Sequence, residues 1–485
     1  MSLPSGCLRP SPSGSAQPLI YFLVGRIFRK PSAAILAMAI YLTSLEVFAV
    51  GITNVLDSLL ACLITATMVV IFLALREESP RRRAVFLGCA GALAGLAFLT
   101  KGFLVFAVLA TVVVPYLMWQ RRWSAMLTAP WVPALAALVV ALPWSIAIHL
   151  EEPDFWRYFV WVEHLSRFFG PTDYARHPEP FWFFVPILVA SLVHWAPLLP
   201  AAVSGLRRSE DADELIRFSI CWIVGPFLFF SASGGKLGTY ILPCFPPIAI
   251  LFGLGLDRAV RLNRRRLLAC GAALSGGLAG IAAGLLVVSQ WAGWSAARWY
   301  EPGESWKWVL AATAFAVWAF LSWFAAVKMP ARSAVHVFCL APVVFMLSVN
   351  FMIPNESGEG KMPGRFLREH AGLVDARATV FSDERAFRAV CWYLGRSDIV
   401  MAGRAGELSY GLSYPDAAGR MMTVSEMVDL IRSAERTTDV AVIVSSTTVR
   451  RWVEQGLLAD LPTPTHNGEA DGYVVAVFGR LHGRG

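Results

Sequence analysis

Long apolar runs, separated by short polar turns, occupy most of the first 353 residues of the chain. A helix needs about 20 mostly apolar residues to cross the hydrocarbon core of a bilayer. On this basis we expect eleven membrane spans, at about 33–50, 56–75, 85–100, 102–118, 128–149, 181–204, 216–232, 239–257, 267–290, 307–328 and 334–353. The composition agrees, because only 16% of the residues are charged, against roughly 25% in soluble domains. The sequence therefore predicts an α-helical polytopic membrane protein.

Basic residues cluster in every second turn between these runs. The clusters are Arg26, Arg29 and Lys30; Arg76 and Arg81–Arg83; Arg121 and Arg122; Arg207 and Arg208; Arg258, Arg261 and Arg264–Arg266; and Lys328 and Arg332. The positive-inside rule places these turns on the cytoplasmic side. The turns between them, and everything after residue 350, then lie outside. The net charge of +8 thus follows from membrane orientation, and we expect no nucleic-acid partner.

The two ends of the chain differ from its apolar middle. Residues 1–19 are rich in Ser, Pro and Gly and predict an unstructured leader, followed by a membrane domain at 20–353. From 354 to 485 strand-like and helix-like runs alternate, which predicts a soluble α/β domain on the outer side. Within it, Thr423 and Glu426 have the spacing of a helix capping box. The eight cysteines are scattered and predict no disulfide.

One polar stretch, at 143–186, interrupts the apolar pattern. Between 154 and 169 its apolar residues recur at helical spacing, while Arg157 and His164 fall on the opposite face. An aromatic-rich amphipathic helix between two spans is expected to lie flat at the membrane surface. Its polar face would then look toward the interior of the membrane domain.

Charged groups at membrane depth are costly, so those next to the outward turns are functional candidates. They are Asp57, Lys101, Arg157, Glu163, His164 and Lys236, with Tyr240 close by. Ordinary explanations stay open: an N-terminal helix acid for Asp57, lysines that reach the headgroups, a helix ion pair between Glu163 and Arg167, and a structural histidine. Together, however, cations and carboxylates at one face suit the transfer of a group from a lipid phosphate.

Several of these residues lie in runs that resemble the lipid A aminoarabinose transferases, within the protein O-mannosyltransferase-like integral-membrane glycosyltransferases. The runs extend from REE to LTKG and include PDFWRYFVWVEHLSRF, HPEPFWFFVP, SGGKLGTYILPCFPPIAIL and GELSYGL. The resemblance implies a GT-C type fold in the bacterial inner membrane, with a periplasmic active face and C-terminal domain. It implies transfer of a sugar, aminoarabinose or a similar one, from a polyprenyl-phosphate donor to lipid A or another periplasmic acceptor.

The resemblance also implies roles for individual residues. It makes His164 a ligand of a divalent metal ion such as Zn²⁺, and it places Lys101, Lys236 and Tyr240 around the lipid phosphate or the sugar. Asp57 lies near the site and is the catalytic candidate. Arg157 and Glu163 are further substrate-binding candidates.

In one respect the chain departs from the family pattern. The family carries its principal catalytic aspartate in an outer loop after an additional first span, whereas here no acidic residue precedes Glu46. We therefore expect the chain as given to bind its donor without transferring the sugar. Two alternatives stay open, a non-catalytic truncated remnant and a transporter of lipids or solutes.

Overall fold

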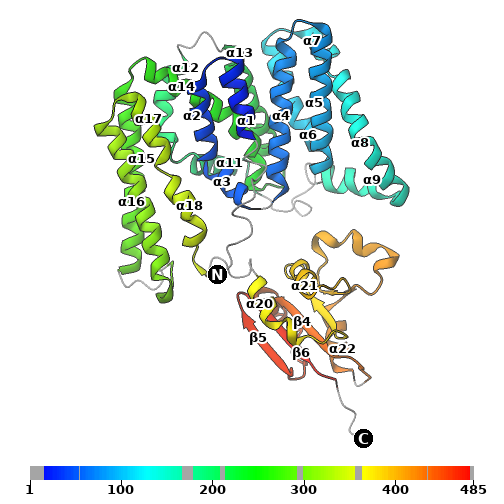
Figure 1. Ribbon diagram of the computed structural model, residues 1–485. Coiled ribbons are helices and arrows are strands. Elements are labelled where there is room, and N and C mark those ends of the chain that lie inside the picture. The colour runs from blue at the N-terminus through cyan, green and yellow to red at the C-terminus, as the bar shows by residue number, and fades with distance from the viewer. Residues whose placement is uncertain are drawn as a thin grey trace. The chain divides into compact units, whose positions relative to one another are not determined.

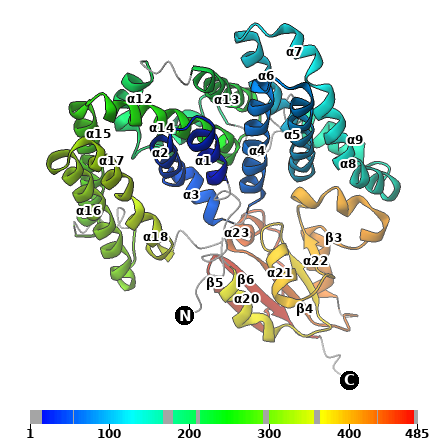
Figure 2. The same ribbon diagram turned by 45° about the horizontal axis from the view of Figure 1, so that its top comes forward.

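The computed structural model describes residues 16–53, 55–166, 179–207, 213–291, 299–355, 363–433 and 435–480 (Figures 1 and 2). The chain divides into two compact units. The first is helical and extends to Phe351, apart from one short segment that ends at Lys307. That segment and residues 352–485 form the second unit.

The first unit consists of helices alone among its described residues. They are α1 (Ala16–Tyr21), η1 (Phe22–Ile27), α2 (Pro31–Leu42), α3 (Leu45–Ile52), α4 (Leu56–Arg76), α5 (Pro80–Lys101), α6 (Leu104–Trp119), α7 (Trp123–Thr128), α8 (Trp131–Glu151), α9 (Phe155–Arg157), η2 (Tyr158–Ser166), α11 (Phe184–Ser191), η3 (Ala196–Leu198), α12 (Leu199–Leu206), α13 (Asp213–Ala232), η4 (Gly238–Cys244), α14 (Phe245–Arg261), α15 (Arg265–Trp291), α16 (Ser305–Lys328), α17 (Ala331–Leu340) and α18 (Val343–Met352).

These helices lie at the positions of the eleven predicted spans, and eight to ten of them have the length and composition to cross a membrane. In the described part of the chain, eight are long and apolar enough to cross a membrane, two more are bent pairs, and α6 is a shorter apolar helix. The helix α1 begins at Ala16, inside the stretch predicted as an unstructured leader, and buries Ala16 and Ile20. The rest of that stretch lies outside the described residues.

Two spans are broken, and their breaks are bonded to each other. The α2–α3 pair bends by 61° and the α11–α12 pair by 84°. At the first break Thr43 Oγ1 and Ser44 Oγ donate to carbonyls of α2, four residues back. At the second break Trp195 Nε1 donates to Thr43 Oγ1 over 2.8 Å. The breaks therefore keep their polar groups satisfied inside an apolar unit, as a membrane interior requires.

A histidine at the second break bonds to three neighbouring helices. His194 is 2% exposed. Its Nε2 donates to the Phe338 carbonyl of α17 over 3.0 Å, which leaves Nδ1 to accept from Trp318 Nε1 of α16 and Ser275 Oγ of α15. A single neutral tautomer satisfies all three bonds, so His194 packs α15, α16 and α17 against the bend.

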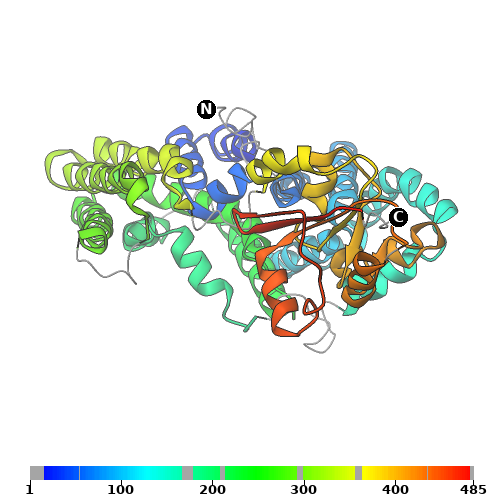
Figure 3. The same ribbon diagram turned by 90° about the horizontal axis from the view of Figure 1, so that it is seen from below.

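The second unit is an α/β domain around a six-stranded sheet. Its strands are β1 (Thr379–Ser382), β2 (Val400–Ala402), β3 (Met421–Met422), β4 (Val440–Ser445), β5 (His466–Ala470) and β6 (Tyr473–Phe478). The order is β3-β2-β1-β4-β6-β5, with β1 to β4 parallel and the β5–β6 hairpin antiparallel. Seen edge-on, the sheet has helices on both faces (Figure 3).

The α-helices of this unit that cover the sheet are α20 (Gly364–His370), α21 (Phe387–Leu394), α22 (Val424–Arg432) and α23 (Ser446–Glu454). One face of the sheet buries Phe366 and Val390 from α20 and α21, and the other buries Ile431 and Trp452 from α22 and α23. The predicted capping box is confirmed, because Thr423 and Glu426 exchange bonds at the start of α22.

The predicted amphipathic helix is present as α9 and η2, but His164 lies on a different face from the one predicted. A π-helix closes its hydrogen bonds over five residues instead of four, so the His164 ring meets the Phe159 ring edge to face, with ring centres 4.6 Å apart. Its Nδ1 lies 2.7 Å from the Phe159 carbonyl oxygen. The other side of the ring meets Gly102, which ends α5 at φ 77° and ψ −155°. Only glycine adopts this backbone conformation readily.

We expect Gly102→Ala to destabilise the protein by about 1–3 kcal/mol, since the backbone there is strained for any other residue. A Cβ at this position would also lie 2.5 Å from His164 Nε2. The measurement is the unfolding temperature of the purified chain in detergent. Gly88→Ala is the matched control, because a Cβ at Gly88 on the same helix meets open space. Equal unfolding temperatures for the two variants would show that Gly102 does not set this contact.

Candidate functional site

Three segments far apart in sequence meet at one end of the first unit. Asp57 lies in the first turn of α4, Lys101 is the last residue of α5, and Thr239 lies in η4. The ammonium of Lys101 pairs with Asp57 Oδ1, and Thr239 Oγ1 donates to Asp57 Oδ2 over 3.0 Å. We call these three residues the outer cluster, because they occupy turns predicted to face outward.

Each charge in the outer cluster suits the helix end that carries it. An acid is favoured at a helix N-terminus and a cation at a C-terminus, which is where Asp57 and Lys101 stand. The Lys101 ammonium also lies 5.0 Å from the centre of the Tyr240 ring, a cation–π distance. Asp57, Lys101, Thr239 and Tyr240 line one small cavity of about 10 Å³, about the space of one water molecule. This cavity is therefore too small to enclose a ligand larger than a water molecule.

Bonds at the opposite end of the helices agree with the predicted sidedness. Arg76, at the end of α4, pairs with Glu214 of α13 over 3.0 Å. Arg122 Nη1 donates to the Leu75 carbonyl over 2.6 Å. Two of the basic clusters thus meet at one end of α4, while Asp57 stands at the other.

Lys236 is buried just before η4 and is bonded to backbone. It is 4% exposed, and its ammonium donates to the carbonyls of Ser233 (2.6 Å) and Glu179 (2.7 Å). These bonds use two of the three N–H donors of a lysine. Burial lowers the pKa of Lys236 from its ordinary value, and the nearby Glu179 carboxylate acts in the opposite direction.

Two residues of this region were not singled out in the sequence. Thr239 lies inside the SGGKLGTY run and bonds to Asp57. Glu46, in the first turn of α3, has Oε1 3.6 Å from where a Cβ of Gly238 would stand. A signal for Glu46 was present, because it is the first acidic residue of the chain and lies within an apolar run.

The amphipathic helix contacts the outer cluster region through Gly102. This glycine follows Lys101 directly and contacts the His164 ring. Glu163 Oε1 accepts a bond from Tyr158 Oη over 2.7 Å, and Arg157 is exposed. Among the described residues, the side chains of Arg157, Glu163 and His164 form no direct bond to Asp57 or Lys101.

His164 alone does not make up a metal site. Its Nδ1 faces a carbonyl oxygen, which orients the ring and leaves Nε2 as the free ring nitrogen. However, no group of three His, Cys, Asp or Glu side chains with suitable spacing occurs in the part of the chain that the structure describes. The described residues therefore do not form a complete ligand set, and the metal ion stays a prediction.

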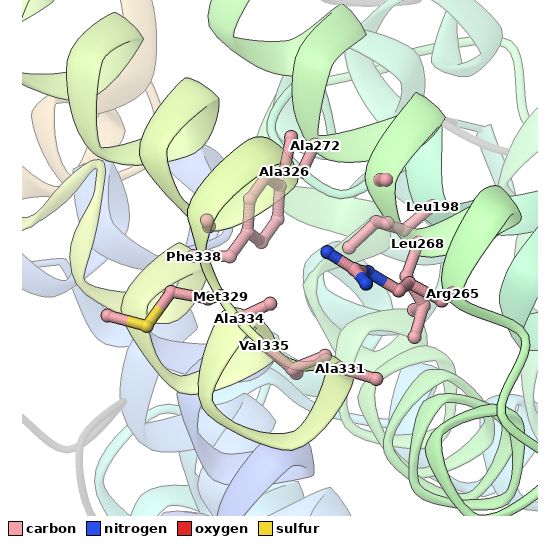
Figure 4. A pocket seen from close by; sticks show the side chains of 12 residues that line it. Leu198, Arg265, Leu268, Ala272, Ala326, Met329, Ala331, Ala334, Val335 and Phe338 are labelled. Carbon is pink, nitrogen blue, oxygen red and sulfur yellow. The ribbon is translucent and has the colours of Figure 1, made fainter.

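Another cavity of the first unit, near the ends of α15, α16 and α17, is a packing gap (Figure 4). It holds about 10 Å³, and its lining is apolar except for Arg265. The predicted site residues are not among those that line it. We assign it no role in substrate binding.

Comparison with known families agrees with both units. Residues 13–159 match the family described as dolichyl-phosphate-mannose-protein mannosyltransferase. Residues 358–477 match the family described as arabinosyl transferase ArnT, C-terminal domain. The solved structure of ArnT from Cupriavidus metallidurans bound to undecaprenyl phosphate is similar in fold, with a TM-score of 0.74 at 20% identity, over 96% of this chain and 81% of that one.

Two curated relatives are similar over most of their length. The undecaprenyl phosphate-alpha-4-amino-4-deoxy-L-arabinose arabinosyl transferase 2 of Proteus mirabilis is 34% identical over 92% of this chain and 79% of its own. The corresponding transferase of Edwardsiella ictaluri is 37% identical over 84% of this chain and 73% of its own. The chain belongs to the family of undecaprenyl phosphate-aminoarabinose arabinosyl transferases.

Proposed function

We propose that this chain is a glycosyltransferase of the bacterial inner membrane, which moves 4-amino-4-deoxy-L-arabinose from undecaprenyl phosphate to lipid A at the periplasmic face. The observation that carries the proposal is the outer cluster, where Asp57 holds the Lys101 ammonium at the end of the helices opposite the basic turns. Lys236 lies in the turn just before η4, the element that carries Thr239 of the cluster. Family membership supports the same donor, since its relatives are named for undecaprenyl phosphate-linked aminoarabinose.

The two lysines differ in how they are held. Lys236 is fixed by two carbonyls, and one N–H is left to donate to an oxygen of the donor phosphate. Lys101 is held by Asp57 and by the Tyr240 ring. We assign Asp57 an orienting role, because both of its oxygens already accept bonds from Lys101 and Thr239.

In the transfer, an acceptor phosphate oxygen forms a bond to the anomeric carbon of the sugar. The bond from that carbon to the donor phosphate oxygen breaks, and undecaprenyl phosphate leaves with the electron pair. Negative charge therefore grows on the donor phosphate as the bond breaks. Ammonium groups that are already oriented stabilise such charge without reorganising during the reaction.

Lys101→Met and Lys236→Met should each weaken binding of undecaprenyl phosphate roughly 10-fold or more, because a hydrogen bond to a charged group contributes about 1.5–3 kcal/mol. The measurement is native mass spectrometry of the purified chain with added undecaprenyl phosphate. Lys328→Met is the control, since this exposed lysine ends α16 in a basic turn predicted to be cytoplasmic.

Binding is measured first because it reports on the two lysines directly. Transfer is then read as a gain of one aminoarabinose by lipid A, in a strain that makes the donor but lacks its own transferase. If the unaltered chain binds no undecaprenyl phosphate, or if both lysine variants bind it as tightly as Lys328→Met, the proposal is wrong.

A divalent metal ion at His164 is a separate proposal. If His164 is a ligand, the purified chain should hold about one such ion, and His164→Ala should lose it. Metal content is measured by inductively coupled plasma mass spectrometry, with His149→Ala as the control at an exposed histidine near the end of α8. If His164→Ala keeps the same metal content, His164 is not a ligand, and its role is limited to its packing contact with Gly102.

A further inference from the structure

The second unit contains a cavity at the carboxyl ends of its parallel strands. Asp383 follows β1, Gly403 and Arg404 follow β2, and Thr448 lies in the first turn of α23 after β4. All four line a cavity of about 380 Å³, within the size range of sites for small molecules. Between β1 and β4 the connections change direction, since β2 and β3 lie on one side of β1 and β4 lies on the other. Ligands of open parallel sheets bind at such a point.

The floor of this cavity is rigid and its acidic group is fully engaged. Asp383 is 4% exposed. Its Oδ2 accepts from Ser445 Oγ (2.6 Å), Thr448 Oγ1 (2.5 Å) and the Ser445 amide (3.3 Å), while Oδ1 accepts from the Ala386 amide (2.9 Å). These bonds join the ends of β1 and β4 and spread the negative charge over four donors. Asp383 is therefore a structural residue here.

The rim of the cavity is cationic. Arg385, Arg404 and Arg451 line it, from the turn after β1, the turn after β2 and the helix α23. Within the described part of the chain, no carboxylate forms an ion pair with any of these three guanidinium groups. One further acidic residue lines the cavity, Glu384, which is exposed and lies against the turn at Gly406. Three guanidinium groups against this one exposed carboxylate leave the rim with a net positive charge.

The local backbone adds to this preference for an anion. The helices α21, α22 and α23 follow β1, β3 and β4, so all three begin at the same edge of the sheet. Their N-termini add partial positive charge there. The first amides of α22 and α23 are taken up by Thr423 and Ser445 as caps, so the arginine side chains are the donors left for a ligand. Guanidinium groups suit phosphate in particular, because their fork matches two phosphate oxygens.

We propose that this cavity binds the phosphate-bearing sugar of the acceptor lipid headgroup. The proposal rests on the proposed function for the choice of acceptor, and on the cavity itself for the class of ligand. A bare phosphate would leave most of the cavity empty, whereas a phosphorylated hexosamine also reaches the side chain of Gln455, which lines the same space. The three arginines hold the phosphate, and Gln455 meets the sugar hydroxyls.

The test uses the full chain in detergent and titration calorimetry with glucosamine 1-phosphate. The double variant Arg404→Gln, Arg451→Gln should bind it roughly 100-fold more weakly than the unaltered chain, since each lost charge-assisted bond costs about tenfold. Arg450→Gln is the matched control, because this exposed neighbour of Arg451 on α23 does not line the cavity. Any binding of the probe at the lysines of the first unit is common to all three proteins and cancels in the comparison.

Three further probes separate the possible sources of the phosphate. Inorganic phosphate and unphosphorylated glucosamine should both bind more weakly than glucosamine 1-phosphate, and vesicles with lipid A should bind the control better than the double variant. The proposal is overturned if the double variant matches Arg450→Gln, or if inorganic phosphate binds as tightly as the sugar phosphate. If the proposed function is wrong, the unaltered chain does not bind undecaprenyl phosphate. The comparison with glucosamine 1-phosphate can still be made in that case, because it measures a different site.

Discussion

The ion pair between Lys101 and Asp57 decides how the outer end of the first unit is built. It joins the start of α4 to the end of α5, and the bond from Thr239 adds the segment that follows α13. A lone charge at this depth would be costly in lipid, but each of these charges has an opposite partner and a favourable helix end. The same ion pair that makes these charges tolerable at this depth holds an ammonium group beside the turns where the donor phosphate is proposed to bind.

The residue after Lys101 carries the second constraint. Gly102 has a backbone conformation that other residues rarely adopt, and it is packed against the rings of His164 and Phe159. The amphipathic helix therefore touches the helix end that presents Lys101. A movement of this helix would displace Gly102, which is the residue next to Lys101 of the ion pair. His164 is therefore linked to the outer cluster by packing, whether or not it binds a metal ion.

The sequence predicted the parts of this arrangement that depend on composition and charge. Hydropathy predicted the spans, and the alternation of arginine clusters predicted that Asp57, Lys101 and Tyr240 share one end. Features set by tertiary packing were not predicted: the breaks near Thr43 and Trp195, and the π-helix that turns His164 onto Phe159. In the second unit β3 has only two residues, too few for a visible alternation. The β5–β6 hairpin did carry a signal, the Asp471-Gly472 turn with φ of 53° and 76°.

The central claim is that Asp57 orients Lys101 for the donor phosphate, and a double-mutant cycle on undecaprenyl phosphate binding tests it most directly. The affinity is measured for the unaltered chain, Asp57→Asn, Lys101→Met and the double variant. If Asp57 acts through Lys101, Asp57→Asn weakens binding when Lys101 is present and does not weaken it when Lys101 is replaced, with a coupling of roughly 1–2 kcal/mol. The same change in affinity in both backgrounds would contradict the account, because Asp57 would then act on the phosphate independently of Lys101.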